Sequence, residues 1–308
     1  MMAIKQRRRH SALLFICLLL TCLLSAVFLA DDLSFAVKSG IELSVGTIIP
    51  SLFPFMILAD LTISSMPKES GFAEKVFQKL LCLDGSLLGV FIIGNLSGAP
   101  VGASMISALR KKAEISRENA ECALAISSGP SLAFTVSGVG SAMWDNTFVG
   151  IFLYISVILA SVIYAIVSSR GKSQINHISH SAPKKFELIK SIESATFASL
   201  RVAGVITAFT VVTHLVRKLK MSEWASAVII PLIELGGAVS YLSEGAFSMR
   251  AALIITAFAL GFSGFSIHLQ VRSAIVDTDM RYSRFLLAKL VIGILSASIF
   301  SVFLLFIK

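Results

Sequence analysis

Long segments without Asp, Glu, Lys or Arg are the feature that most constrains this chain. A helix that spans a bilayer needs about 20 predominantly apolar residues. Seven segments meet or approach this requirement: Ser11–Ala30, Leu43–Ala59, Gly85–Leu109, Cys122–Trp144, Asn146–Ser169, Ala251–Val271 and Leu290–Ile307. Two more, Ser191–Leu215 and Glu223–Ser243, are interrupted by one or two charges. The pattern predicts an all-α polytopic membrane protein with about nine hydrophobic elements.

The composition excludes a water-soluble body of this size. Of the 308 residues, 56% are hydrophobic and 15% are charged, whereas soluble domains carry roughly 25% charged residues. The 4 cysteines form no CxxC pair, which argues against a metal site and a disulfide framework. We therefore expect a multi-pass protein of the cell membrane that holds no metal and no cofactor.

The formal net charge of +9 is concentrated in basic clusters that flank apolar segments, at residues 5–9 and 170–190. Cytoplasmic loops of membrane proteins are enriched in Lys and Arg, so this charge indicates topology rather than nucleic-acid binding. The first cluster precedes Ser11–Ala30, which is longer than the usual apolar core of a signal peptide. We favour an uncleaved transmembrane helix within residues 1–34, with a cleaved signal peptide as the alternative.

The segment Gly85–Leu109 has basic residues on both flanks, which favours a hairpin that re-enters the membrane over a simple span. Its centre contains Gly94, Gly98, Pro100 and Gly102, which are poor material for a continuous helix. The alternative is close helix packing, because these glycines follow a small-xxx-small spacing. We interpret this segment as the first candidate for a functional site, since irregular backbone at membrane depth occurs where protein or a cavity covers it.

The rest of the chain repeats one order of broken and unbroken segments. Residues 35–170 and residues 188–308 each contain a long helix, an interrupted segment, a broken helix and a plain span, and a basic cytoplasmic linker at 171–187 joins them. An odd number of crossings in each copy would place the two copies in inverted orientation. Inverted repeats with paired broken helices are typical of secondary transporters, whose site lies near the midplane.

Four ionisable residues lie deepest in the apolar segments, namely Asp60, Arg201, Glu234 and His268. Such residues are functional candidates because a charge in lipid is costly. Each has a structural alternative: Asp60 reaches the membrane interface, Arg201 pairs with Glu234, and His268 is a hydrogen-bonded packing residue. No catalytic signature stands out, and His268 with Asp60 is the one conceivable catalytic pair, so we expect no enzyme.

Several motifs resemble the nucleoside-recognition, or Gate, domain family, and within it the sporulation integral membrane proteins of the YlbJ type. The similarity covers roughly residues 35–305 and is carried, in order, by Ile49-Pro50-Ser51-Leu52-Phe53-Pro54-Phe55, Gly98-Ala99-Pro100-Val101-Gly102-Ala103, the connection Arg110–Glu121, Gly129-Pro130 and the stretch Gly261–Gln270. The resemblance implies a transport-like fold of two gate-like repeats and a part in forming the spore cortex or envelope.

The chain departs from that family at two positions. Relatives usually have an aromatic residue where this chain has Ala99, and an Asn-Asn pair where it has Ser127-Ser128. Hydroxyl groups reach less far than amides, so we expect weaker selectivity for a nucleoside base.

The leading hypothesis is a permease-like carrier in the lipid bilayer that binds a small polar, nucleoside-like solute between the repeats. The helix N-termini after Pro100 and Pro130 would suit an anionic group. The alternative is a non-transporting membrane scaffold for spore envelope assembly, and a homo-oligomer is left open. The candidate binding residues are Asn95, Ser97, Gly98, Pro100, Gly102, Ser128, Gly129, Pro130, Ser131, Glu234, Ser263 and His268.

Overall fold

The computed structural model describes residues 29–65, 71–169, 188–219, 221–243 and 247–305, and these residues contain helices and no strand. Four helical segments within them are long and apolar enough to cross a membrane: Thr147–Ser169, Leu188–Arg217, Met249–Ile275 and Tyr282–Phe303. The chain is therefore a helical, multi-pass membrane protein. The predicted first span at 11–30 and the linker at 171–187 lie outside or almost outside the described residues.

The first half begins with a nearly continuous helical rod that is longer than the predicted segment Leu43–Ala59. A π-helical turn, η1, interrupts the rod just before Pro50, and Pro54 lies inside the helix that follows. Proline lacks the N–H that would continue the hydrogen-bond ladder, which explains why the rod is irregular here. The elements are α2 (Ala30–Leu43), η1 (Ser44–Ile48), α3 (Ile49–Ser65) and the short amphipathic α4 (Phe72–Leu81).

Two broken helices and one plain span complete the first half. Gly98 ends the first helix of the broken pair with a φ of 96°, a conformation that glycine adopts without strain. A Cβ built on Gly94 would lie 3.1 Å from the Gly102 Cα, so the chain turns back on itself at Gly98. The two helices therefore form a hairpin, and its re-entry into the membrane stays a prediction. The elements are α5 (Leu87–Ser97), α6 (Ala99–Lys111), α7 (Arg117–Ser127), the π-helical η2 (Phe134–Met143) and α8 (Thr147–Ser169).

The second half shows the same order of unbroken and broken helices. Its breaks fall at Glu234 and at Ser263, and Ser263 has a φ of 78°. The elements are α9 (Leu188–Arg217), α10 (Glu223–Ile233), α11 (Leu235–Ser243), α12 (Met249–Phe262), α13 (Gly264–Ile275) and α14 (Tyr282–Phe303). The inverted orientation of the two halves, with the boundaries 35–170 and 188–308, stays a prediction.

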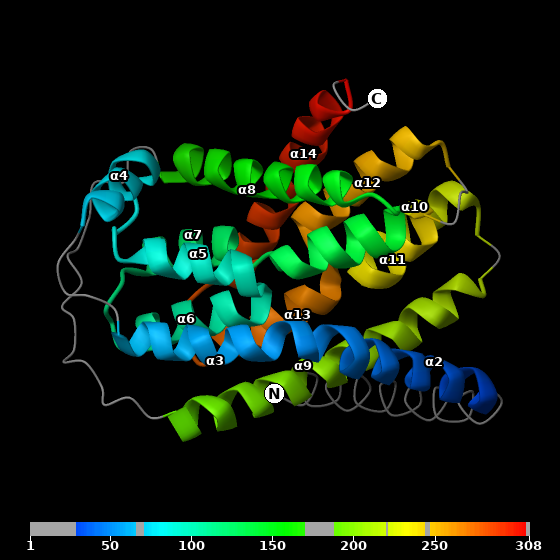
Figure 1. Cartoon of the computed structure of the whole chain (residues 1–308), viewed down its shortest axis with the longest axis horizontal. Coiled ribbons are helices and arrows are strands. Elements are labelled where there is room, and N and C mark those ends of the chain that lie inside the picture. Colours follow the sequence, from blue (N-terminus) through cyan, green and yellow to red (C-terminus); the bar gives the residue numbers. More distant parts are fainter. Residues whose placement is uncertain (1–28, 66–70, 170–187, 220, 244–246, 306–308) are drawn as a thin grey trace, which may run out of the picture.

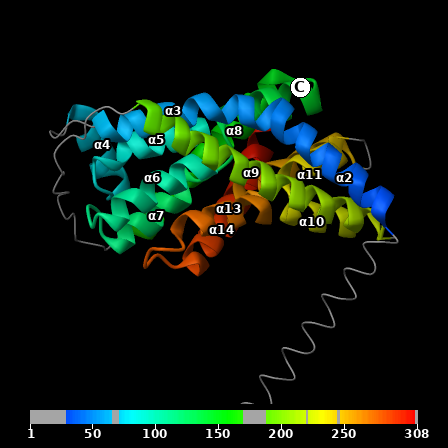
Figure 2. The same ribbon diagram turned by 90° about the horizontal axis from the view of Figure 1, so that it is seen from below.

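The two halves interlock rather than lie apart. Figure 1 shows α2, α3 and α9 along one face and α8 along the opposite face, with α13 between them. In the view from below, α9 runs across the molecule beside α2 and α3 (Figure 2). Across the halves, α3 packs on α9, α6 on α13, and α8 on α14. The broken helices thereby meet in the interior.

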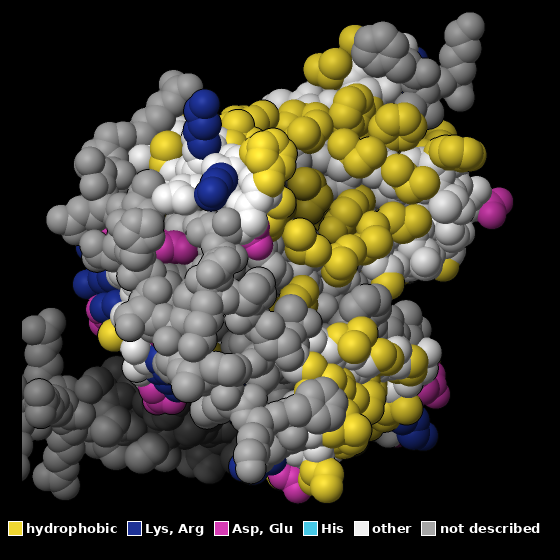
Figure 3. Space-filling model, turned by 60° about the vertical axis from the view of Figure 1, so that its left-hand side comes forward, with side chains coloured by type: hydrophobic (Ala, Val, Ile, Leu, Met, Phe, Trp, Pro, Cys, Tyr) yellow, Lys and Arg dark blue, Asp and Glu magenta, His cyan; other side chains and the backbone are white. Residues whose placement is uncertain are grey.

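The outer surface is apolar, as expected for contact with lipid. Phe148 on α8, Phe197 on α9 and Leu287 on α14 are 71%, 69% and 63% exposed. On the face drawn in Figure 3, hydrophobic side chains form broad areas and charged side chains lie mostly toward the margins. Large exposed apolar areas of this kind indicate an interaction with lipid or another apolar partner.

Candidate functional site

Three of the four helix breaks meet at one pocket in the interior. Its empty volume, open solvent at the mouth included, is about 540 Å³, which lies within the range of small-molecule sites. The pocket walls come from both halves of the chain and from the long helices α3 and α9. The lining residues are Leu52, Gly98, Ala99, Pro100, Gly129, Pro130, Ser131, Phe134, Val202, Ile206, Glu234, Leu235, Ser266, Ile267 and Gln270.

Half of the residues predicted from the sequence line this pocket. They are Gly98, Pro100, Gly129, Pro130, Ser131 and Glu234. Together they place the backbone of two breaks of the first half opposite a break of the second half. The segments that were expected to carry the site therefore come together.

The N-terminus of α6 faces this pocket without a side-chain cap. Its cap residue is Gly98, which has no side chain to accept a hydrogen bond, although its carbonyl accepts from the N–H groups of Val101 and Gly102, at 3.2 and 3.3 Å. Pro100 has no N–H, so the Ala99 N–H is the remaining donor of this first turn. The first N–H groups of a helix need a partner and carry a partial positive charge. This helix end is therefore suited to a negatively charged group.

The helix end after Pro130 differs from our expectation. The Ser131 hydroxyl accepts a hydrogen bond from the Phe134 N–H at 3.1 Å, and the Ser131 carbonyl accepts one from Thr135 at 3.0 Å. Ser131 thus caps the helical turn that leads into η2. The prediction of an anion-binding helix end after Pro130 is wrong for the Phe134 N–H, because this group already donates to the Ser131 hydroxyl.

Glu234 caps a helix instead of pairing with Arg201. Its carboxylate accepts hydrogen bonds from the N–H groups of Gly236, at 2.8 Å, and Gly237. Glu234 is buried, whereas Arg201 is exposed on α9. The alternative of an Arg201–Glu234 ion pair is wrong, because the break exposes N–H groups that satisfy the carboxylate locally. The side chain of Asp60 lies outside the described residues.

Other predicted residues serve the packing around the pocket. Asn95 donates hydrogen bonds to the carbonyl oxygens of Phe91 and Ile126, at 2.8 and 3.0 Å, and so ties α5 to α7. Gly102 lies against the Ser127 carbonyl. The Ser263 hydroxyl donates to the Leu260 carbonyl at 3.1 Å.

His268 is also held by the fold. Its ring nitrogens lie 2.9 Å from the Phe262 carbonyl oxygen and 3.1 Å from the Tyr282 hydroxyl. The ring packs on Phe262 and Phe285. His268 is therefore enclosed by the packing around α13, and it does not line the pocket.

The most unusual residue near the site, Lys289 on α14, was not among the candidates. Its side chain is 1% exposed, and the Cβ that Gly129 would carry lies 3.7 Å from its Nζ. Within the described residues, no hydrogen bond or ion pair is made by this amine. Lys289 was not predicted because the apolar segment was defined as free of charged residues and therefore started at Leu290. An ionisable residue inside an apolar segment is, however, the feature that indicates a functional site.

Hydroxyl groups without a hydrogen-bond partner in the described part of the chain gather around the same breaks. They belong to Ser97, Ser127 and Ser128, all buried. Two polar residues of α13, Ser266 and Gln270, line the pocket from the second half. Buried polar groups in native proteins are almost always paired. Ser266 and Gln270 can therefore supply hydrogen bonds to a bound molecule, whereas the three hydroxyls are buried beside the pocket and do not line it.

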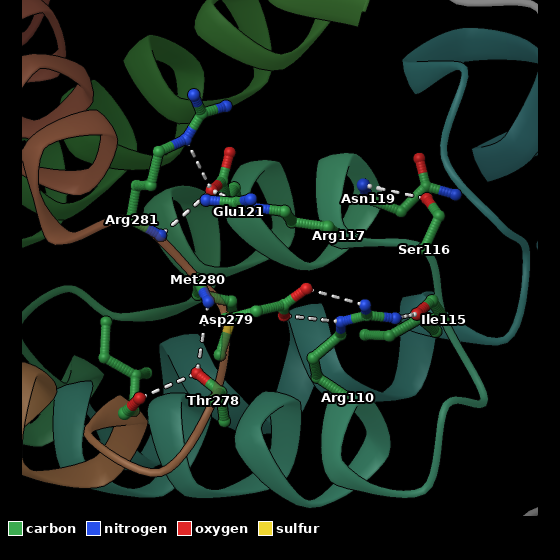
Figure 4. Close-up of polar contacts among 11 residues, drawn as sticks. Arg110, Ile115, Ser116, Arg117, Asn119, Glu121, Thr278, Asp279, Met280 and Arg281 are labelled. Carbon is green, nitrogen blue, oxygen red and sulfur yellow. Dashed lines mark hydrogen bonds and ion pairs between the residues drawn. The ribbon is translucent and has the colours of Figure 1, made fainter.

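A charged network lies at the far ends of the helices that wall the pocket. It joins the α6–α7 connection to the α13–α14 connection and is drawn in Figure 4. Arg110 donates two hydrogen bonds to the Asp279 carboxylate, at 2.9 and 2.8 Å. Lys111 pairs with Asp277 at 3.1 Å. The Arg110 guanidinium lowers the pKa of Asp279, which lies in the connection outside the spanning segments.

Glu121 is the centre of the same network. Its buried carboxylate lies 3.0 Å from Arg117, 3.3 Å from Arg281 and 3.2 Å from Arg284. It also accepts a hydrogen bond from the Arg281 backbone N–H at 2.9 Å. Burial alone would raise the pKa of Glu121, but the hydrogen bonds from Arg281 and Arg117 outweigh it, so the pKa lies below its ordinary value.

Comparison with known proteins gives one similarity of note. The chain is 25% identical over 306 residues to the sporulation integral membrane protein YlbJ of Bacillus subtilis (strain 168), and the match covers 85% of this chain and 75% of that protein. No family model matches the chain, so the Gate-domain resemblance is not shown. No solved structure matches it either.

Proposed function

We propose that this protein is a membrane carrier that binds a small organic anion in the pocket between its two halves. The single observation that carries the proposal is Lys289, a buried amine without a partner among the described residues, whose Nζ lies 3.7 Å from the position of a Cβ on the lining residue Gly129. Ionisable groups inside a membrane protein are rare and usually mark a binding site or an ion path.

An anionic group of the solute would give Lys289 the counter-charge that the described residues do not provide. Burying a charge is costly unless it is paired, so a residue of this kind favours a ligand of opposite charge. The N-terminus of α6 at Gly98, which has no side-chain cap, adds a donor at the pocket wall. The unpaired hydroxyls of Ser97, Ser127 and Ser128 are buried next to the lining residues Gly98 and Gly129 in the chain. These groups support an anion more than a neutral nucleoside.

The remaining walls are suited to the apolar body of such a solute. Leu52, Val202, Ile206, Phe134 and Ile267 line the pocket. Pockets of small-molecule sites are mostly apolar, with a few polar groups that fix orientation. We propose no catalytic step, because both ring nitrogens of His268 are already within hydrogen-bond distance of Phe262 and Tyr282.

We further propose that the carrier acts in spore formation, at the membrane of a sporulating cell. The similarity to the YlbJ protein supports this role, and the resemblance of the motifs to Gate domains supports the transport activity. Both belong to the proposal, since a carrier and a scaffold are equally compatible with that similarity.

The test is uptake of labelled solutes into proteoliposomes that contain the purified protein. Uridine and uridine monophosphate form a matched pair that differs by the phosphate, and benzoate is a small carboxylate without a nucleoside. We expect saturable uptake of at least one anion, no uptake of uridine, and loss of uptake in Lys289→Met. Arg201→Met, which removes an exposed cation from α9, is the matched control and should leave uptake unchanged.

Two outcomes would contradict the carrier. Uptake of uridine without discrimination, or anion uptake that persists in Lys289→Met, would show that Lys289 does not bind the solute. Absence of uptake for all three probes would favour the scaffold, provided that the same preparation is folded and that its gene restores sporulation to a Bacillus subtilis strain without its YlbJ protein.

The scaffold is the second candidate, and the close packing of the glycines favours it. Cβ atoms on Gly94 and Gly102 would lie 2.4 and 1.9 Å from the Ser127 carbonyl oxygen. The same glycines would then serve to hold α5, α6 and α7 in a compact unit, without a transported solute.

A further inference from the structure

The charged network at the ends of α6, α7 and α13 bridges the two halves of the chain. The ion pairs Arg110–Asp279, Lys111–Asp277 and Glu121–Arg281 each join a residue of the first half to a residue of the second. Arg284 adds a further bridge to Glu121. Contacts of this kind have to separate if the two halves move apart at this end.

The network lies at the end of the helices that also wall the pocket. Helix α6 lines the pocket at Pro100 and enters the network at Arg110. Ten residues of α-helix span about 15 Å. Helix α13 likewise lines the pocket at Gln270, and the connection that follows it carries Asp277 and Asp279.

Apolar side chains fill the space between the pocket and the network. Helix α6 contributes Met105, Ile106 and Leu109, and Val271 and Ile275 on α13 pack in the same cluster. All five are at most 6% exposed. Close packing of this density leaves no passage for a solute.

We propose that these two layers, the apolar cluster and the charged network, form a gate that closes the pocket at this end. The proposal rests on the proposed function, because it takes the pocket as the solute site. Opening separates Arg110 from Asp279 and Glu121 from Arg281 and Arg284, and closing restores both contacts. Partly exposed ion pairs are individually weak, so several together hold the gate shut without locking it.

Asp32 and Lys218 provide a matched contact elsewhere. This ion pair joins α2 of the first half to the residue that directly follows α9 of the second. Asp32 also lies 3.9 Å from His214. The pair bridges the halves as the gate does, but it lies near the N-terminal end of α2, which is on the other side of the molecule from α6 and α7 (Figure 1). Removal of the Asp32–Lys218 ion pair is therefore a control that distinguishes general destabilisation of the protein from opening of the gate.

The test is the labelling rate of one cysteine in the pocket with a membrane-impermeant maleimide. Ser266→Cys supplies the cysteine in a chain whose native cysteines are replaced by serine, and Lys112→Cys identifies the membrane face that bears the network. We expect Arg110→Ala combined with Glu121→Gln to raise labelling of residue 266 from that face by roughly three- to tenfold, the range for loss of several exposed ion pairs. Asp32→Asn should leave that rate unchanged.

A cross-link provides the opposite measurement. Cysteines in place of Arg110 and Asp279 should form a disulfide on oxidation, and labelling of residue 266 from this face should then fall below the rate of the reduced protein and recover with dithiothreitol.

The gate is overturned if the rates stay within error of the parent in variants that keep their elution volume and remain folded at the temperature of labelling. It is equally overturned if Asp32→Asn raises labelling as much as the double variant does. Labelling requires no transported solute, so a failure of the gate is distinguishable from a failure of the carrier, which is decided by uptake.

Discussion

Gly102 and Ser127 are in backbone contact: a Cβ on Gly102 would lie 1.9 Å from the Ser127 carbonyl oxygen. Helices α6 and α7 therefore approach each other more closely than any other residue at position 102 would allow. The contact fixes the spacing between Gly98 and Gly129, which form neighbouring parts of the pocket wall. The geometry of the candidate site thus depends on a glycine that does not line it.

Replacement of this glycine should destabilise the protein. We expect Gly102→Ala to lower the free energy of unfolding by about 1–3 kcal/mol, the usual cost of overpacking. Gly204→Ala on α9 is the control, because a Cβ there meets nothing within 4 Å, and it should stabilise the helix by about 0.5–1 kcal/mol. Thermal unfolding in detergent measures both. Equal unfolding temperatures for the two variants would refute the close contact.

Removal of the buried amine should stabilise the empty protein. Lys289→Met replaces an unpaired polar group with an apolar side chain of similar length, so we expect a gain of about 1–3 kcal/mol in unfolding free energy. Lys79→Met changes an exposed residue of α4 and should stay within about 0.5 kcal/mol of the parent. A large loss of stability in Lys289→Met would mean that the amine is paired in the fold.

The charged network should weaken in acid. The folded state lowers the pKa of Glu121. Its carboxylate therefore stabilises the fold at pH values above the ordinary glutamate pKa of about 4.3. This stabilisation is lost as the pH falls through the lowered pKa. We expect the unfolding temperature to fall between about pH 5 and about pH 3, and Glu121→Gln to be less stable at neutral pH with a weaker pH dependence. An identical pH profile for parent and variant would contradict this role.

One strained position offers a stabilising change. Ala113 follows α6 with a φ of 56°, a conformation that costs a residue with a Cβ about 1–2 kcal/mol. Ala113→Gly should therefore raise the unfolding free energy by about 1 kcal/mol. Ala108→Gly, inside α6, should lower it by about 0.5–1 kcal/mol. Destabilisation by both changes would contradict the left-handed conformation of Ala113.

The broken helices could be predicted from the sequence because the residues that cause them act locally. Gly98 and Pro100 interrupt a helix wherever they occur, and basic flanks marked the hairpin. Lys289 was missed because segments were drawn to exclude charges. An ion pair between Arg201 and Glu234 was considered because of their opposite charges. In the structure the N–H groups of Gly236 and Gly237 bind the Glu234 carboxylate instead. The contributions of Leu52 and Val202 to the pocket depend on the packing of α3 and α9, which no single segment encodes.

The two halves have different groups at their corresponding helix breaks, and for the proposed carrier this difference predicts a stoichiometry. In the second half, Glu234 occupies the N-terminus of α11 with a carboxylate of the chain itself. In the first half, the N-terminus of α6 has glycine at that place and no side-chain cap. A chain of two similar halves would otherwise offer two equivalent anion positions. With one of them taken by an internal ligand, each chain should bind a single solute.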